Sequence, residues 1–210
     1  MSQRHAQQLD HTRTDPADDP YLDAVRACVM AVGVRRTTAT DVARRAGVSR
    51  MTLYRRFEDV AAMIAALMTR EFTGVVRDAA LAAAHLEPAR ARLVRAAVQG
   101  AEDIASNDLW RRILDIDPEL VLPYVTQRLG GVQEAGLAML AVQVQAGIDD
   151  GSIRDEDPAR LAATIELTLR GHVLAAHAYT APERARTCQE LERMLDGYLR
   201  PDPPTTTGGR

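Results

Sequence analysis

The segment from Thr37 to Phe57, TTATDVARRAGVSRMTLYRRF, constrains the fold of this chain more than any other stretch. Thr38, followed three residues later by Asp41, is a variant of the capping box and predicts that a helix begins here. Gly47 lies where that helix must end, because glycine tolerates the left-handed backbone common at helix C-termini. Ser49 then offers an oxygen to the N–H groups of a second helix. The segment therefore predicts two short helices joined by a tight turn.

The sizes of the residues in this segment allow the two helices to cross closely. Ala43 is small, Gly47 follows four residues later, and Leu53 is apolar, as a helix-turn-helix requires. Leu53 and Phe57 give the second helix one buried stripe. On the solvent side of this helix we expect polar, basic and apolar side chains that can contact base edges, thymine methyls and phosphate oxygens. These side chains are those of Ser49, Arg50, Met51, Thr52, Tyr54 and Arg55.

Positive charge is concentrated in the same part of the chain. From Arg35 to Arg56 there are seven arginines and one acid, Asp41, whereas the whole chain has a net charge of -3. Such an excess on one small surface is typical of proteins that bind a polyanion. Together with the helix-turn-helix pattern, it predicts binding to DNA.

This segment, preceded by an amphipathic helix and followed by a long one, resembles the DNA-binding domain of the TetR family of bacterial transcriptional regulators. The match covers Tyr21 to Phe72, with the threonine cap, the AxxAGVS turn and the LYRRF ending in order. The rest of the chain resembles the family in length and helical layout. One departure comes just after Phe57: many members carry a lysine a few residues later, where this chain has Glu58, Asp59 and Val60.

The resemblance implies roles for individual side chains. Bases or adjacent phosphates would be met by Ser49, Arg50, Thr52 and Tyr54, and Met51 completes this set. The DNA backbone would be positioned by Thr38, Arg55 and either Arg35 or Arg44. For Arg35, a solvated surface position is an equally good interpretation.

The resemblance also implies a function and partners. We expect a repressor that binds operator DNA as a homodimer and is released by a small-molecule ligand. Two DNA-binding domains on a symmetric dimer would span half-sites about 34 Å apart or more, so the operator should be a near-palindrome. The alternatives are an architectural DNA-binding protein without ligand control and a ligand-processing enzyme, which no sequence motif predicts.

Composition indicates helices throughout, because aromatics make up only 4% of the chain and β-branched alternation is scarce. We therefore expect an all-α protein, with an N-terminal three-helix helix-turn-helix domain and, by the resemblance, a C-terminal helical bundle for ligand binding and dimerisation. The expected parts are a disordered tail (1–19), the DNA-binding domain (20–57), a connecting helix (58–85), the regulatory and dimerisation domain (86–200) and a disordered tail (201–210).

Apolar periodicity places further helices. Pro88 and Asn107 are expected to open helices, and Pro118 a third that runs through Val125. Over residues 132–148, apolar residues occupy almost every side of the expected helix, which predicts that this helix is buried. The helix from Tyr21 is expected to end at Gly33 and to bury a stripe made of Leu22, Val25, Val29 and Val32.

Two helices are expected near the C-terminus, over 158–179 and 182–199, and their apolar stripes make them the predicted dimer interface. Gly171 in the first would allow close approach of another helix. The acidic run over 149–157, DDGSIRDED, lacks the alternating oxygen ligands of a calcium loop. It is expected to be a turn in which Asp157 caps the next helix.

Candidates for a ligand pocket are Trp110, Tyr124 and His172, each with core packing as the alternative. His172 and His177 lie five residues apart on one helix, which does not suit a shared metal ion, so no metal site is predicted. No cofactor motif or catalytic motif is present, and neither a cofactor nor catalysis is expected. Asp115 and Asp117 are expected to be solvated turn acids, with binding of a cationic ligand near Trp110 as the alternative.

The two cysteines, Cys28 and Cys188, fall on apolar helical stripes and are expected to be small core residues in a reducing compartment. No apolar run approaches the ~20 residues that span a bilayer. The N-terminus is polar and has no signal-peptide core. We therefore expect a cytoplasmic protein without a membrane segment.

Overall fold

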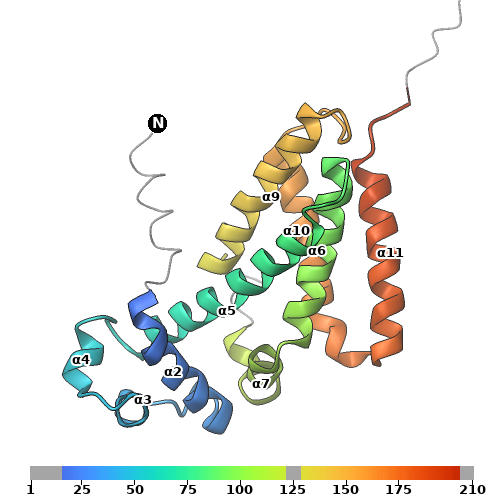
Figure 1. Cartoon of the computed structure of the whole chain (residues 1–210). Helices are drawn as coiled ribbons and strands as arrows, with labels where there is room; N and C mark the ends of the chain where they lie inside the picture. The colour runs from blue at the N-terminus through green and yellow to red at the C-terminus, as the bar shows by residue number, and fades with distance from the viewer. Residues whose placement is uncertain (1–15, 122–128, 204–210) are drawn as a thin grey trace, which may run out of the picture. The chain divides into compact units, whose positions relative to one another are not determined.

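The structure is a computed structural model that describes residues 16–121 and 129–203 (Figure 1). Within these ranges every regular element is helical, which confirms the predicted all-α fold. The elements in chain order are η1 (Pro16–Asp18), α2 (Asp19–Val32), α3 (Ala39–Ala46), α4 (Arg50–Tyr54), α5 (Val60–Ala83), α6 (Ala89–Ser106), α7 (Asp108–Ile116), η2 (Pro118–Leu120), α9 (Gly131–Asp149), α10 (Pro158–Ala175), η3 (Ala176–Ala178) and α11 (Ala181–Leu199).

The described residues form two compact units. The helix-turn-helix unit comprises the residues up to Val75 together with Asp103–Gly136. The bundle unit comprises Val76–Glu102 and the residues from Leu137 onward. This division differs from the expected boundaries at residues 57 and 85, because α7 packs against α2. A segment distant in sequence thus completes the unit that carries the DNA-binding helices.

Helix α2 supports the helix-turn-helix unit. Leu22, Val25 and Val29 are fully buried in its core, as the periodicity predicts. Val32 does not continue this stripe as expected: it is 36% exposed because it is the last residue of the helix, beyond the packed turns. The N-terminal tail prediction is also wrong over its last four residues. They are helical, with a proline in the first turn of α2, where its missing N–H costs nothing.

Asp117 is buried rather than solvated, which corrects the expectation of a turn acid. Its side chain is 3% exposed and its Oδ2 accepts a hydrogen bond from the backbone N–H of Val34 at 2.7 Å. Asp115, by contrast, is exposed as expected. A buried carboxylate needs such a partner, because an unpaired charge in the core is costly. Asp117 therefore ties the end of α7 to the end of α2.

Local signals place the start of α7 correctly but not the helix expected after it. Asn107 caps α7, its Oδ1 accepting hydrogen bonds from Leu109 N and Trp110 N, as predicted. Pro118 opens only the three-residue 3-10 helix η2, so the longer helix expected there is wrong over its described part. The remainder of that expected helix, including Tyr124 and Val125, lies outside the described residues.

The core of the bundle unit is formed by apolar side chains of α6, α9, α10, α11 and the turn before α10. Helix α9 is not buried all round, since Val142 is 67% exposed and Met139 is 39% exposed. An apolar side chain of a helix is buried only where another element packs against it. Among the described residues, no element packs closely enough on these two side chains to bury them. The prediction of a fully buried helix is therefore wrong.

The acidic segment before α10 is a turn, as predicted. Gly151 adopts a left-handed φ of 72°, and the N–H groups of Ser152 and Ile153 both donate to the carbonyl of Gly147. Asp157 caps α10, its Oδ1 accepting from Ala159 N at 3.0 Å. The helix ends at Ala175 and η3 comes next, so the first of the two predicted C-terminal helices is shorter than expected. No described helix is long and apolar enough to cross a membrane.

Candidate nucleic-acid interface

Side-chain caps and one left-handed glycine set the bend between α3 and α4. Thr38 Oγ1 accepts a hydrogen bond from Asp41 N at 3.2 Å, and Ser49 Oγ accepts one from Thr52 N at 3.1 Å. Gly47 has φ 69° and ψ 27°, and its N–H donates to the carbonyl of Ala43. These contacts confirm both predicted N-caps and the turn at Gly47.

Packing then determines which side of α4 faces the core. Leu53 of α4 and Val42 of α3 are fully buried, and Ala43 is 4% exposed. Phe57, just beyond α4, is 7% exposed. A helix of five residues is not stable by itself in water, so its position depends on these apolar contacts. With one stripe buried, the remaining side chains of α4 are directed to solvent.

The solvent side of α4 contains the side chains expected to contact DNA. Met51 is 71% exposed and Tyr54 is 47% exposed. Thr52 is half-buried, with its Oγ1 3.0 Å from Ser49 Oγ. The remaining predicted contacts are exposed, namely Arg35, Thr38, Arg44, Ser49, Arg50 and Arg55. The fold thus places all nine predicted DNA-contacting residues at least partly in solvent.

Acidic neighbours divide the predicted arginines into two groups. Arg44 pairs with Asp41 at 2.6 Å, and Arg35 pairs with Glu119 at 2.7 Å. Arg50 and Arg55 have no acidic partner among the described residues. Exposed ion pairs contribute little stability, so a phosphate can replace the acid at Arg35 or Arg44. Arg50 and Arg55 can meet DNA without breaking an ion pair within the described part of the chain.

The predicted ligand candidates do not form one site. Trp110 lies in the core of the helix-turn-helix unit, 8% exposed and edge-on to Phe72, with ring centroids 5.8 Å apart. Tyr124 is outside the described residues. His172 lies in the bundle unit, where it lines a cavity of about 250 Å³. The same cavity is lined by Thr168, Ala175, Tyr179, Arg184 and Leu191, all from α10, η3 or α11 and their junctions.

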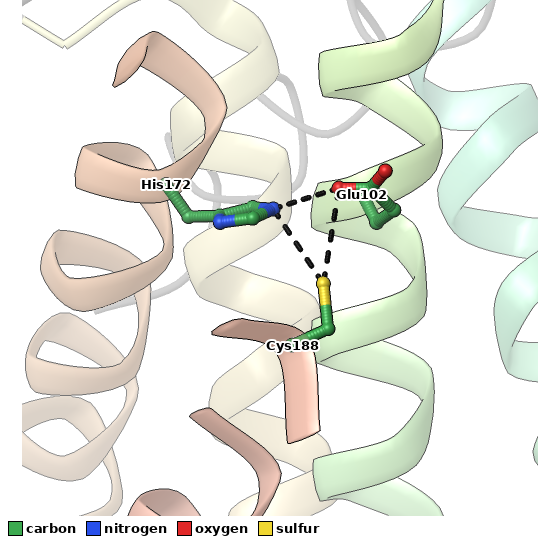
Figure 2. A group of neighbouring side chains, drawn as sticks. All are labelled: Glu102, His172 and Cys188. Atoms are coloured by element: carbon green, nitrogen blue, oxygen red, sulfur yellow. Dashed lines mark hydrogen bonds and ion pairs between the residues drawn. The ribbon is translucent and has the colours of Figure 1, made fainter. Parts of the chain in front are cut away.

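His172 is part of a polar cluster that the sequence did not predict. Its side chain is 5% exposed, and its Nε2 lies 2.9 Å from Glu102 Oε2. Cys188 Sγ lies 3.7 Å from the same nitrogen. A dashed line marks this contact in Figure 2. Burial, followed by the charge of Glu102, raises the pKa of the Cys188 thiol to about 11. The prediction that Cys188 is a small core residue is therefore wrong, because it belongs to a polar cluster. Cys28 is a core residue as predicted, with 2% of its surface exposed.

Comparison with known proteins supports the interpretation of the N-terminal helices. The family model for bacterial regulatory proteins of the tetR family matches residues 22–67. An HTH-type transcriptional regulator of Mycobacterium tuberculosis is 33% identical over 179 residues, which are 85% of this chain and 92% of that relative. The residues matched by the family model include most of α2 and all of α3 and α4, where the predicted DNA contacts lie.

Solved structures share the fold over most of the chain. A TetR-family transcriptional regulator from Pectobacterium atrosepticum has a TM-score of 0.68 at 19% identity, covering 92% of this chain and 96% of that one. The regulator FadR from Bacillus subtilis, solved in complex with stearoyl-CoA, has a TM-score of 0.59 at 15% identity, covering 86% of this chain and 98% of that one. Both are described as transcriptional regulators. The chain belongs to the TetR family and is a helix-turn-helix transcriptional regulator.

Proposed function

We propose that this regulator is a repressor that binds a near-palindromic operator as a homodimer and leaves it when a small molecule binds the bundle unit. The observation that carries the DNA-binding half of the proposal is the solvent side of α4. Arg50 and Arg55 there are exposed and have no acidic partner among the described residues. Met51 and Tyr54 add large exposed side chains that suit thymine methyls and phosphates.

Dimerisation is proposed through α10 and α11. Leu167 of α10 is 65% exposed and Met194 of α11 is 50% exposed, so each helix has a large apolar side chain in solvent. Gly171, one helical turn after Leu167, lines the cavity described above, so the helix contact is proposed through Leu167 and Met194. A partner copy would remove this apolar surface from water.

The proposed effector site is the cavity that His172 lines. Its volume of about 250 Å³ is close to the lower limit of ordinary ligand pockets, about 300 Å³. His172, Tyr179 and Arg184 provide polar atoms, and Leu191 provides an apolar wall. We infer an organic effector with both polar and apolar groups, which would match this lining.

The role of α4 is tested by replacing Arg50 with alanine. A lost base contact costs about 1–3 kcal/mol, which corresponds to a roughly 5- to 150-fold loss of affinity. The measurement is a fluorescence titration with a duplex selected from random DNA by the wild-type protein. Arg77→Ala is the matched control, since Arg77 is 71% exposed in α5, pairs with the neighbouring Asp78, and lies outside both α4 and the proposed dimer helices. Equal affinity of Arg50→Ala and wild type would remove Arg50 from the interface.

The same titration separates the proposed regulator from an architectural DNA-binding protein. A sequence-specific repressor should bind its selected duplex about 10³-fold or more tightly than random DNA at physiological salt. An architectural protein binds both mainly through phosphates and shows little preference. Similar affinities for the two duplexes would therefore favour the second function.

Ligand control is tested with compounds that raise the melting temperature of the protein in a screen of small organic molecules. An effector must bind the DNA-free state more tightly than the DNA-bound state, so it should weaken operator binding by about 5- to 150-fold. Affinity for the selected duplex is measured with and without each compound. Compounds that fill the cavity but leave operator affinity unchanged would contradict ligand control.

A further inference from the structure

Glu102, His172 and Cys188 come from three different helices of the bundle unit and point to a common centre. They lie on α6, α10 and α11, respectively, and Figure 2 shows their side chains converging. One carboxylate oxygen, one imidazole nitrogen and one thiol sulfur lie within 4.8 Å of one another. This is the combination of atoms from which proteins build sites for zinc-like ions.

The distances between these atoms fit a tetrahedral ion. With metal–ligand bonds of about 2.0–2.3 Å, two ligands of a tetrahedral zinc site lie roughly 3.3–3.6 Å apart. Here the sulfur lies 3.7 Å from His172 Nε2 and 3.8 Å from Glu102 Oε2. The nitrogen and that oxygen lie 2.9 Å apart. Shifts of a few tenths of an ångström would therefore accommodate the ion.

A neighbouring side chain already orients the carboxylate. Arg184 Nε lies 3.1 Å from Glu102 Oε1, which leaves Oε2 facing His172 and Cys188. Metal ligands are usually held by such outer hydrogen bonds, which fix the orientation of the liganding atom. The guanidinium contacts the oxygen that faces away from the cluster. Arg184 thus supports a three-ligand site without occupying it.

We propose that Glu102, His172 and Cys188 bind one divalent metal ion of the zinc class. A thiolate and a carboxylate would balance the two charges of the ion, which suits a largely buried position. Thiolate and imidazole ligands favour Zn²⁺ or Co²⁺ over Mg²⁺ and Ca²⁺, which prefer oxygen atoms. Because His172 and Arg184 also line the cavity, the fourth coordination position can be filled from that side by water or another small ligand.

The experiment is a titration of the reduced, metal-free, full-length protein with Co²⁺. We expect one equivalent of Co²⁺ to bind and to produce the charge-transfer absorption of a cobalt–thiolate bond, and Zn²⁺ to abolish that absorption. Cys188→Ala should lose the band. Cys28→Ala is the matched control and should keep it, since Cys28 is buried in the other unit.

The two other ligands are tested in the same way. His172→Ala and Glu102→Gln should each weaken Co²⁺ binding by more than about tenfold. His177→Ala should leave it unchanged, because His177 lies in η3 and is exposed. Circular dichroism of the metal-free variants checks that they fold. If Cys188→Ala does not fold, Zn²⁺ should instead slow alkylation of Cys188 but not of Cys28 in the wild-type protein.

Several outcomes would overturn the site. The site would be wrong if the wild-type protein showed no cobalt–thiolate band, if Cys188→Ala kept the band, or if Cys28→Ala lost it. It would also be wrong if Zn²⁺ did not change the alkylation rate of Cys188. This inference does not depend on repression, because metal binding is measured without DNA. Arg50→Ala should bind Co²⁺ like the wild type, so failure of the metal site and failure of the proposed DNA contact are distinguishable.

Discussion

Replacing Leu53 with alanine is expected to lower the free energy of unfolding of the helix-turn-helix unit by about 2–5 kcal/mol. Leu53 is fully buried and is the side chain of α4 that anchors this five-residue helix. Truncation leaves a cavity and removes most of the apolar contact that holds α4 in place. Because the solvent side of α4 is oriented by that contact, binding to the selected duplex should be lost as well.

Urea denaturation followed by circular dichroism measures the stability change, and hydrogen exchange of the α4 amides localises it. Met51→Ala is the matched control on the same helix, since Met51 is 71% exposed. Its stability should stay within about 0.5 kcal/mol of wild type, while its operator affinity falls. If Leu53→Ala unfolds at the wild-type urea concentration, α4 is held by something other than its apolar stripe.

Replacing Gly33 with alanine is expected to destabilise the same unit by an amount comparable to that for Leu53→Ala. Gly33 has φ 85° and ψ 171°, a region almost restricted to glycine, where strain costs about 1–3 kcal/mol. A Cβ would also lie 2.7 Å from Asp117 Oδ2 and 2.8 Å from Ile116 Cγ2. Relieving these contacts would disturb the bond from Val34 N to Asp117 and add about 1–3 kcal/mol for overpacking.

Gly74→Ala provides the control for a glycine without such constraints. It lies within α5, and a Cβ there would meet nothing within 4 Å. This change should stabilise the protein by about 0.4–1 kcal/mol, because alanine restricts the unfolded chain. Thermal melting of both variants measures the contrast. A Gly33→Ala protein as stable as the wild type would mean that the Asp117 contact is not rigid.

Local sequence signals predicted the DNA-binding part of the molecule well. The caps at Thr38 and Ser49 and the bend at Gly47 depend on atoms within four residues of each other. Such interactions are encoded almost completely by a short stretch of sequence. The burial of Leu53 in α4, and of Phe57 just beyond the end of that helix, was also expected from their spacing of four residues.

Burial was harder to predict where a distant segment decides it. Asp117 has the sequence context of a turn acid, but its partner Val34 is 83 residues away. Helix α9 has apolar residues almost all round, yet Val142 remains 67% exposed. A helical pattern records which faces are apolar. It does not record which of them another element covers.

The amino-acid sequence by itself determined the all-helical class, the helix-turn-helix with its caps, and the concentration of arginine that marks a DNA-binding surface. Only the tertiary structure brought Glu102, His172 and Cys188 together, because Glu102 lies 70 residues from His172 and 86 from Cys188. No local pattern connects residues so far apart. Helix caps and turns depend on short-range geometry, whereas a site built from three helices exists only after apolar packing has set their positions.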